Sequence, residues 1–218
     1  MVRAATVRRL GSQLWPMPAW RSSDRQYNRT TLICPPRHFR THLGALDEDG
    51  WTTITPDQYL VHLITSAPLP RKPVILSFDD GSAGQAKEGL RQLAKRGMTG
   101  VFFVMTVVLG KPGWMSTRDI KRLADAGMTI GCHTWDHHAF SDLSGRDWKI
   151  QLEQSRTTLR RASGQPVEHF AYPYGTVSTK GFSAPATRRL QDRIPARRQK
   201  TSITKSRFTR QHLAKHRR

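Results

Sequence analysis

The feature that most restricts the fold of this chain is a regular alternation of strand and helix signals between residues 73 and 175. Short apolar runs at 74–78, 100–105, 128–132 and 167–171 have the composition of buried strands. Apolar positions at helical spacing lie between them, in segments 86–97, 117–126 and 147–162. Buried strands joined by helical crossovers form a parallel sheet, so the pattern predicts either an open doubly wound sheet or a barrel.

Capping signals mark where two of the helices begin. Ser116 followed by Asp119 predicts a capping box, and Thr55 before Pro56 predicts the first turn of an earlier helix. The apolar faces that we expect to pack inward are Phe39, Leu43 and Leu46; Leu60, Leu63 and Ile64; Ala86, Leu90, Leu93 and Ala94; Ile120, Leu123 and Ala124; and Trp148, Leu152, Ser155 and Leu159.

Charge is distributed unevenly along the 218 residues. The formal net charge is +20, of which residues 1–72 contribute +5, residues 73–175 contribute +3 and residues 176–218 contribute +12. The last segment lacks a periodic signal, and three interpretations are open: a polyanion-binding tail, a solvated disordered extension, or a sequence not selected for folding. We therefore do not predict specific nucleic-acid binding from the net charge.

Membrane and export signals are also weak. No run of 18 or more apolar residues occurs, so we do not expect a membrane span. Residues 1–20 carry three arginines without a continuous apolar stretch behind them, which disfavours a conventional signal peptide.

Two adjacent carboxylates follow the first of the four buried strands. Asp79 and Asp80 precede Gly81, which lets the backbone turn. Parallel α/β folds gather their active-site groups where strands end, so one carboxylate could bind a metal while the other handles protons. A helix N-cap is the alternative interpretation, although a cap needs only one acid.

Two histidines, four residues apart, follow the third strand. If the segment turns helically, His133 and His137 present their imidazoles in the same direction, and His138 points away as a bystander. A carboxylate such as Asp80 would complete a His₂Asp set that leaves a position open for water, which is the composition of a catalytic zinc site. Ordinary surface or core histidines are the alternative.

The third polar cluster, at 170–175, is aromatic and turn-forming, and by itself it is equally compatible with a plain turn over the core. Together the clusters resemble the first three motifs of the polysaccharide deacetylases, the NodB-homology group of carbohydrate esterase family 4. The matching sequences are Asp-Asp-Gly at 79–81, His-Thr-x-x-His at 133–137 and Phe-Ala-Tyr-Pro-Tyr-Gly at 170–175, within a similarity that covers residues 32–175. The resemblance implies an α/β fold, a distorted (β/α) barrel with fewer than eight repeats, and a divalent metal, usually Zn²⁺.

The resemblance also implies a role for each matching residue. Asp80, His133 and His137 would bind the metal, Asp79 would be the catalytic base, and the backbone N–H of Tyr174 would help to stabilise the oxyanion. The implied reaction removes N-acetyl or O-acetyl groups from an acetylated polysaccharide or oligosaccharide and releases acetate. Aromatic side chains that would offer an apolar face to a sugar ring, or else pack in the core, are Trp114, Trp135, Tyr172 and Tyr174.

The chain departs from the family pattern in two places. Ala171 stands where an arginine often orients the base, a variant that occurs in one branch of the family. After Gly175 we find neither the family's fourth motif nor its Leu-x-His fifth motif, whose histidine protonates the leaving amine, and the sequence at 213–216 has the wrong spacing. We therefore expect a barrel that is incomplete at its C-terminal end, and we interpret residues 176–218 as a replaced C-terminus, for instance from a frameshift.

These observations divide the chain into a basic N-terminal extension (1–31), a NodB-homology domain (32–175) and a basic, disordered tail (176–218). The leading hypothesis is a metal-dependent polysaccharide deacetylase, of a family that commonly acts outside the cytoplasm. One alternative is a catalytically impaired or dead deacetylase fragment that acts at most as a carbohydrate-binding module. The other is a basic protein that binds polyanions through its tail.

Overall fold

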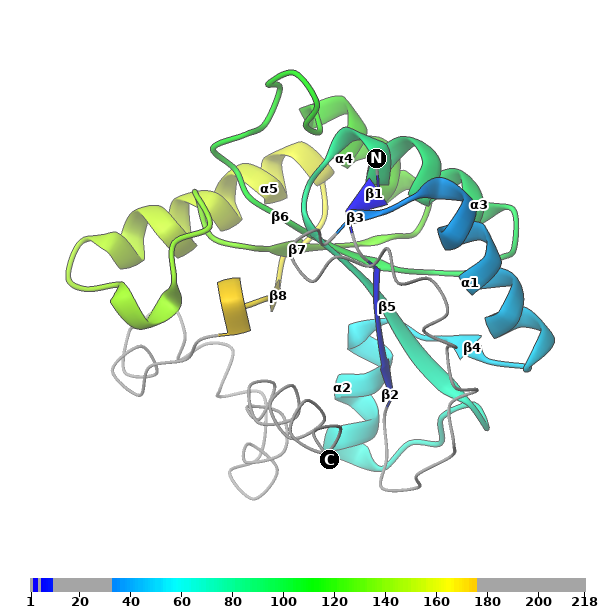
Figure 1. Ribbon diagram of the computed structural model, residues 1–218. Helices are drawn as coiled ribbons and strands as arrows, with labels where there is room; N and C mark the ends of the chain where they lie inside the picture. The colour runs from blue at the N-terminus through cyan, green and yellow to red at the C-terminus, as the bar shows by residue number, and fades with distance from the viewer. Residues whose placement is uncertain (1, 4, 10–32, 176–218) are drawn as a thin grey trace, which may run out of the picture.

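A computed structural model describes residues 2–3, 5–9 and 33–175 of the chain (Figure 1). At its centre is a six-stranded sheet in the order β2-β5-β6-β7-β8, with β4 also paired to β5. The strands are β2 (Ala5–Arg9), β4 (Thr52–Thr53), β5 (Pro73–Asp80), β6 (Val101–Val104), β7 (Thr129–Cys132) and β8 (His169–Phe170). Strands β4 to β8 pair in parallel, whereas β2 runs antiparallel to β5. A separate antiparallel pair is formed by β1 (Val2–Arg3) and β3 (Ile33–Cys34).

The predicted α/β fold with a parallel sheet is confirmed. Each of the four strand segments expected between 73 and 175 contains a strand, although the last is shortened to β8. Within the described residues no strand joins β8 back to β2, so the sheet is curved but not closed, as expected for an incomplete barrel. Strands β1 and β2 were not predicted, because the basic sequence before residue 32 carries no strand pattern. The expectations for residues 176–218 fall outside the part of the chain that is described.

The helices occupy the predicted segments. They are α1 (Pro36–Glu48), α2 (Pro56–Thr65), α3 (Leu90–Ala94), α4 (Thr117–Asp125) and α5 (Ser155–Ser163), with short 3₁₀ turns η2 (Phe140–Asp142) and η4 (Pro173–Gly175). Two π-helical segments, η1 (Gln85–Gly89) and η3 (Lys149–Gln154), lead directly into α3 and α5. None of the helices described is long and apolar enough to span a bilayer.

Both predicted helix starts are confirmed by their hydrogen bonds. Ser116 Oγ accepts from the Asp119 N–H at 3.2 Å, and Asp119 Oδ2 accepts from the Ser116 N–H at 2.9 Å. Thr55 and Gln58 make the same reciprocal pair at the start of α2. Each box satisfies backbone donors that would otherwise be left open at the helix end, and this explains why α4 and α2 begin where they do.

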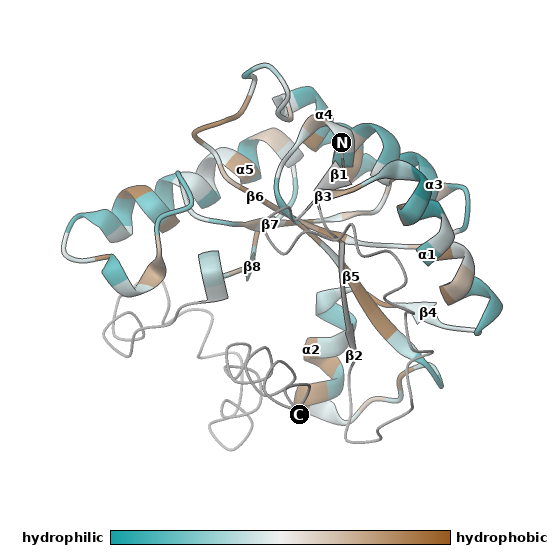
Figure 2. Ribbon diagram, viewed as in Figure 1, coloured by the Kyte–Doolittle hydropathy of each residue, from teal (hydrophilic) through white to brown (hydrophobic). Residues whose placement is uncertain are grey.

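The core lies between the sheet and the helices that pack against its outer side. Figure 2 shows hydrophobic residues along β5 and in patches on those helices. Phe39, Leu43 and Leu46 of α1 are buried as predicted, as are Ile120 and Leu123 of α4. Helix α2 lies apart, and none of its residues is fully buried.

Two predicted faces are wrong in detail. Ile64 of α2 was expected to pack inward, but it is 40% exposed, because α2 lies away from the other helices. Ala94 was expected to pack inward, but it is exposed. The cause is the π-helical turn of η1, which takes more residues per turn than an α-helix and so rotates the buried face of α3 toward Gln92 and Leu93.

The register of the parallel strands decides where their ends lie. Asp80 of β5 pairs with Val104 of β6, Val104 with Cys132 of β7, and Cys132 with Phe170 of β8. These four residues form one row at the carboxyl edge of the sheet. Each of the three polar clusters of the sequence contains a residue of this row or directly follows one. The clusters therefore meet at one edge of the sheet.

Strand β7 has no room for a side chain at Gly131. A Cβ there would lie 2.4 Å from Phe103 Cδ1 and 3.2 Å from the His169 carbonyl oxygen. We expect Gly131→Ala to destabilise the chain by about 1–3 kcal/mol, because β6 and β8 would have to shift. Urea unfolding would measure this, with Gly44→Ala in α1 as the control, since nothing lies within 4 Å of a Cβ at Gly44. A Gly131→Ala chain as stable as the wild type would contradict the described packing.

Candidate metal centre

Strand β5 ends in a turn that presents the Asp80 carboxylate. Asp80 and Gly81 have positive φ angles of 78° and 86°. Gly81 allows this turn, as the sequence predicted. Its lack of a side chain is also needed for space, because a Cβ there would lie 2.7 Å from Val104 Cγ1. The N-cap alternative for the two carboxylates is wrong, because the helical residues begin at Ala83 and neither Asp79 nor Asp80 lies directly before them.

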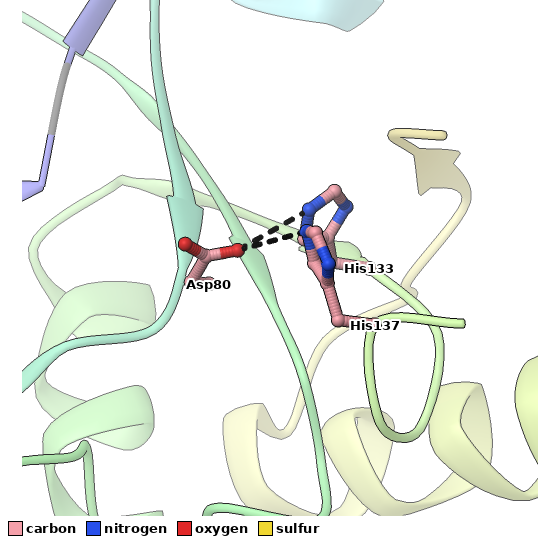
Figure 3. Close-up of side chains that lie close together, drawn as sticks. All are labelled: Asp80, His133 and His137. Carbon is pink, nitrogen blue, oxygen red and sulfur yellow. Dashed lines mark ion pairs between the residues drawn. The ribbon is translucent and has the colours of Figure 1, made fainter. Parts of the chain in front are cut away.

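Asp80, His133 and His137 converge on one point (Figure 3). Asp80 Oδ1 lies 3.4 Å from His133 Nε2 and 3.3 Å from His137 Nε2. The three candidate ligand atoms are all within 4.8 Å of one another. His133 is buried, whereas His137 and Asp80 are partly open to solvent.

The two histidines converge for a reason that the sequence analysis got wrong. The segment between them is not helical, because Thr134 and His137 have positive φ angles of 67° and 69°. Thr134 Oγ1 accepts a hydrogen bond from the His137 N–H at 3.0 Å, which closes the turn. The rings of His133 and His137 meet edge to face, with centroids 4.8 Å apart.

The tautomer of His133 follows from its second contact. His133 Nδ1 lies 2.9 Å from the Ala171 carbonyl oxygen, which can only accept, so Nδ1 carries a proton. In the neutral ring the lone pair is then on Nε2, the atom that faces Asp80 and His137. A backbone carbonyl that orients a histidine in this way is a common feature of metal sites.

The pKa of His133 reflects competing effects. Burial lowers the pKa, but the hydrogen bond with Asp80, the charge of Asp79 and the Ala171 carbonyl raise it by more, so the pKa lies above its ordinary value. A cation bound between these side chains would replace the proton on Nε2.

The donor set fits a zinc ion. Two imidazole nitrogens and one carboxylate oxygen are ligands that Zn²⁺ accepts, with a fourth position left for water or substrate. Two ligands about 2.1 Å from a tetrahedral Zn²⁺ are about 3.4 Å apart. The separations of 3.3 and 3.4 Å between Asp80 Oδ1 and the two imidazoles match that spacing.

Asp79 lies beside this group but is not part of it. Its charge acts on His133, and its backbone carbonyl accepts a 2.7 Å hydrogen bond from the side-chain amide of Gln85. Gln85 is fully buried in η1. The two neighbouring carboxylates are therefore in different positions relative to the histidines, as a division of roles would require.

The aromatic residues divide into two groups. Tyr172 packs against Phe140 and Phe170, with ring centroids 4.7 and 5.0 Å away, and burial raises the pKa of its phenol. Tyr174 is 74% exposed, has a φ of 56°, and places its ring 4.6 Å from that of His137. Trp135 is also exposed, whereas Trp114 is half-buried. Tyr174 and Trp135 thus remain candidates for sugar contact, whereas Tyr172 packs against other aromatic residues.

Neighbours of the two histidines do not join the triad. The side chain of His138 is exposed and faces Asp136 at 3.8 Å. Burial raises the pKa of the Cys132 thiol to about 12, so this group stays protonated although it precedes His133 in the chain.

Sequence reasoning missed four groups that bond to the segments carrying the site: Thr134, Gln85, the carbonyl of Ala171, and Gln151, whose side chain accepts from the Trp135 N–H. Thr134 could have been found from its place inside the His-Thr-x-x-His motif. The glutamines lie in helical segments with nothing in their local sequence to distinguish them, because their role depends on tertiary contacts.

A profile of the polysaccharide deacetylase family matches residues 66–187, more than half of the chain. The chain belongs to the polysaccharide deacetylase family. The profile covers all three clusters of residues that were singled out in the sequence.

Known polysaccharide deacetylases resemble the chain at low identity. A peptidoglycan-N-acetylglucosamine deacetylase of Bacillus cereus is 24% identical over 143 residues, covering 65% of this chain and 50% of that protein. A chitin deacetylase of Pestalotiopsis is 28% identical over 125 residues, 56% of this chain and 40% of that protein. The chain spans about half the length of the curated relatives it matches.

A solved structure has the same fold. The Streptococcus pyogenes deacetylase PplD in complex with acetate matches with a TM-score of 0.66 at 21% identity, over 72% of this chain and 70% of that chain. This likeness supports the curved α/β sheet.

The Thr134 hydroxyl should contribute measurably to stability. Thr134→Val keeps the shape of the side chain but leaves the His137 N–H without its acceptor, and we expect a loss of about 1–2 kcal/mol in urea unfolding. Thr134→Ser, which keeps the hydroxyl, is the matched control and should lose about 1 kcal/mol or less. Equal losses in the two variants would contradict a role for the hydrogen bond.

Proposed function

We propose that this chain hydrolyses acetyl groups on a polysaccharide and releases acetate, with Zn²⁺ held by Asp80, His133 and His137. The observation that carries the proposal is the convergence of these three side chains at the carboxyl edge of the sheet, with the charge of Asp79 acting on one of them. Membership of the family supports the same chemistry. Peptidoglycan and chitin, which are named for two relatives, are the first substrates to consider.

The proposed reaction assigns separate tasks to the residues. When bound, a divalent cation supplies a Lewis acid that polarises the acetyl carbonyl and lowers the pKa of the attacking water. Asp79 accepts the proton that this water loses as its oxygen attacks the carbonyl carbon. The backbone N–H of Tyr174 donates to the oxygen on which negative charge develops. The bond from the acyl carbon to nitrogen, or to oxygen in an ester, then breaks; the leaving group takes up a proton and acetate is released.

The sugar would be held next to His137. Tyr174 and Trp135 expose 74% and 40% of their surface, and both belong to segments that contribute to the candidate site. Exposed aromatic rings with an apolar face and a polar edge suit the mixed surface of a sugar. A polysaccharide is a reasonable ligand for this surface because successive rings could extend along it.

The first prediction of the proposal concerns zinc. The purified chain should bind about one Zn²⁺, and a His133→Ala, His137→Ala double variant should bind none, because a single carboxylate is a weak ligand set. Elemental analysis after dialysis measures the stoichiometry. His138→Ala is the matched control and should retain the ion, since its exposed side chain lies outside the triad. Equal zinc content in wild type and double variant would refute the site.

The second prediction concerns the base. Asp79→Asn should retain zinc but release acetate about 10²–10⁴ times more slowly from N-acetylated chitooligosaccharide or peptidoglycan, because the water loses its proton acceptor. Asp125→Asn, which alters an exposed residue of α4 paired with Lys121, should behave as wild type. Unchanged acetate release by Asp79→Asn would remove Asp79 from the mechanism. A zinc-loaded wild-type chain without acetate release would instead favour the carbohydrate-binding alternative.

A further inference from the structure

The π-helical segment η3 places one buried side chain against the loop that carries His137. Gln151 is 7% exposed, and its amide contacts two successive residues of that loop. Gln151 Oε1 accepts from the Trp135 N–H at 3.0 Å, and Gln151 Nε2 donates to Asp136 Oδ1 at 2.9 Å. The backbone N–H can only donate and the carboxylate can only accept, so the orientation of the amide follows from its partners.

These contacts reach His137 through Asp136. The oxygen that receives the Gln151 amide, Asp136 Oδ1, also accepts from the His138 N–H at 3.2 Å. His137 therefore lies between Asp136, which supplies this oxygen, and His138, whose N–H donates to it. The Trp135 carbonyl accepts from the Val107 N–H at 2.8 Å, which also connects this loop to the turn that follows β6.

The other π-helical segment in the described residues has the same arrangement. Gln85 of η1 is fully buried and donates to the backbone carbonyl of Asp79. In contrast, Gln92 of α3 is also buried, and its side-chain bonds within the described residues go to Glu88 and Arg96, on its own helical face. Single π-type turns inside helices often accompany functional sites, because the wider turn redirects a side chain.

We propose that Gln151 is a positioning residue that holds His137 in place for the metal. It would act through Trp135 and Asp136, without touching the metal or the substrate. This inference rests on the proposed function, because it assigns a role toward the zinc site of Asp80, His133 and His137.

The test compares two buried glutamines in the full chain. Gln151→Met keeps the length of the side chain and removes both hydrogen bonds to the loop. We expect its Kd for Zn²⁺, measured by competition with a chromophoric chelator, to rise about 10–100-fold, the usual effect of losing a group that orients a ligand. Gln92→Met is the matched control, since Gln92 also has one donor and one acceptor bond, and its Kd should stay within about threefold of wild type.

A reciprocal exchange separates hydrogen bonding from packing. Gln151→Glu alone sets two carboxylates against each other and should weaken zinc binding at least as much as Gln151→Met. In the double variant Asp136→Asn, Gln151→Glu, the amide nitrogen at 136 can donate to the carboxylate at 151, which still accepts from the Trp135 N–H. That nitrogen cannot accept from the His138 N–H, so the recovery is partial. We expect the double variant to bind Zn²⁺ about tenfold more tightly than Gln151→Glu. No recovery would contradict positioning by hydrogen bonds.

A metal-free readout completes the test. Amide hydrogen exchange at Trp135 should accelerate in Gln151→Met and remain unchanged in Gln92→Met, because only Gln151 accepts that N–H. If the wild-type chain does not bind Zn²⁺ through His133 and His137, the proposed function fails. If the wild type binds Zn²⁺ and Gln151→Met binds it equally well, or no more weakly than Gln92→Met, the positioning inference alone is overturned.

Discussion

The in-register ending of parallel strands β5 to β8 is the constraint on which the rest of the structure depends. Asp80, Val104, Cys132 and Phe170 form one row, and the residues next to it carry the candidate chemistry. A slip of one residue along a strand would move its end by about 3.3 Å and turn each side chain to the opposite face. Because the ligand atoms of Asp80, His133 and His137 are spaced by distances of this same size, the core that holds the register also holds the site.

Backbone conformations of high energy are concentrated at this edge of the sheet. Of the five non-glycine residues with positive φ in the described part of the chain, four are Asp80, Thr134, His137 and Tyr174. Each such residue costs on the order of 1–3 kcal/mol and persists only when its surroundings determine it. Here the surroundings are specific bonds, such as Thr134 Oγ1 to the His137 N–H and Gln151 to the loop between them. These strained turns bring the Asp80 carboxylate and the His137 imidazole together beside His133.

Local signals in the sequence predicted the fold well, and tertiary contacts account for what they missed. The alternation of strands and helices, the capping box at Ser116 and the N-cap at Thr55 depend on residues close together in the chain, and the structure contains them. The grouping of Asp80 with His133 and His137 followed from strand ends meeting at one edge. The supposed helical turn between the histidines was wrong because hydrogen bonds of Thr134 and Gln151 determine that loop. Ala94 was placed on the wrong face because the spacing of apolar residues does not reveal a π turn. Strand β2 was missed because the sequence that pairs with β5 has no strand pattern of its own.

The buried thiol of Cys132 has a consequence for which ions the site can select. Burial raises the pKa of this thiol to about 12, so the group is protonated at neutral pH. Soft ions such as Cu(I) prefer thiolate ligands, and a thiolate is also the form that oxidants attack. The sulfur of Cys132, one residue from His133, is buried and lies outside the group of ligand atoms, so it is neither open to oxidants in solvent nor a donor that would favour a soft ion. The ligand atoms that lie within 4.8 Å of one another in the described residues are those of Asp80, His133 and His137, so the donors at this edge of the sheet are nitrogen and oxygen.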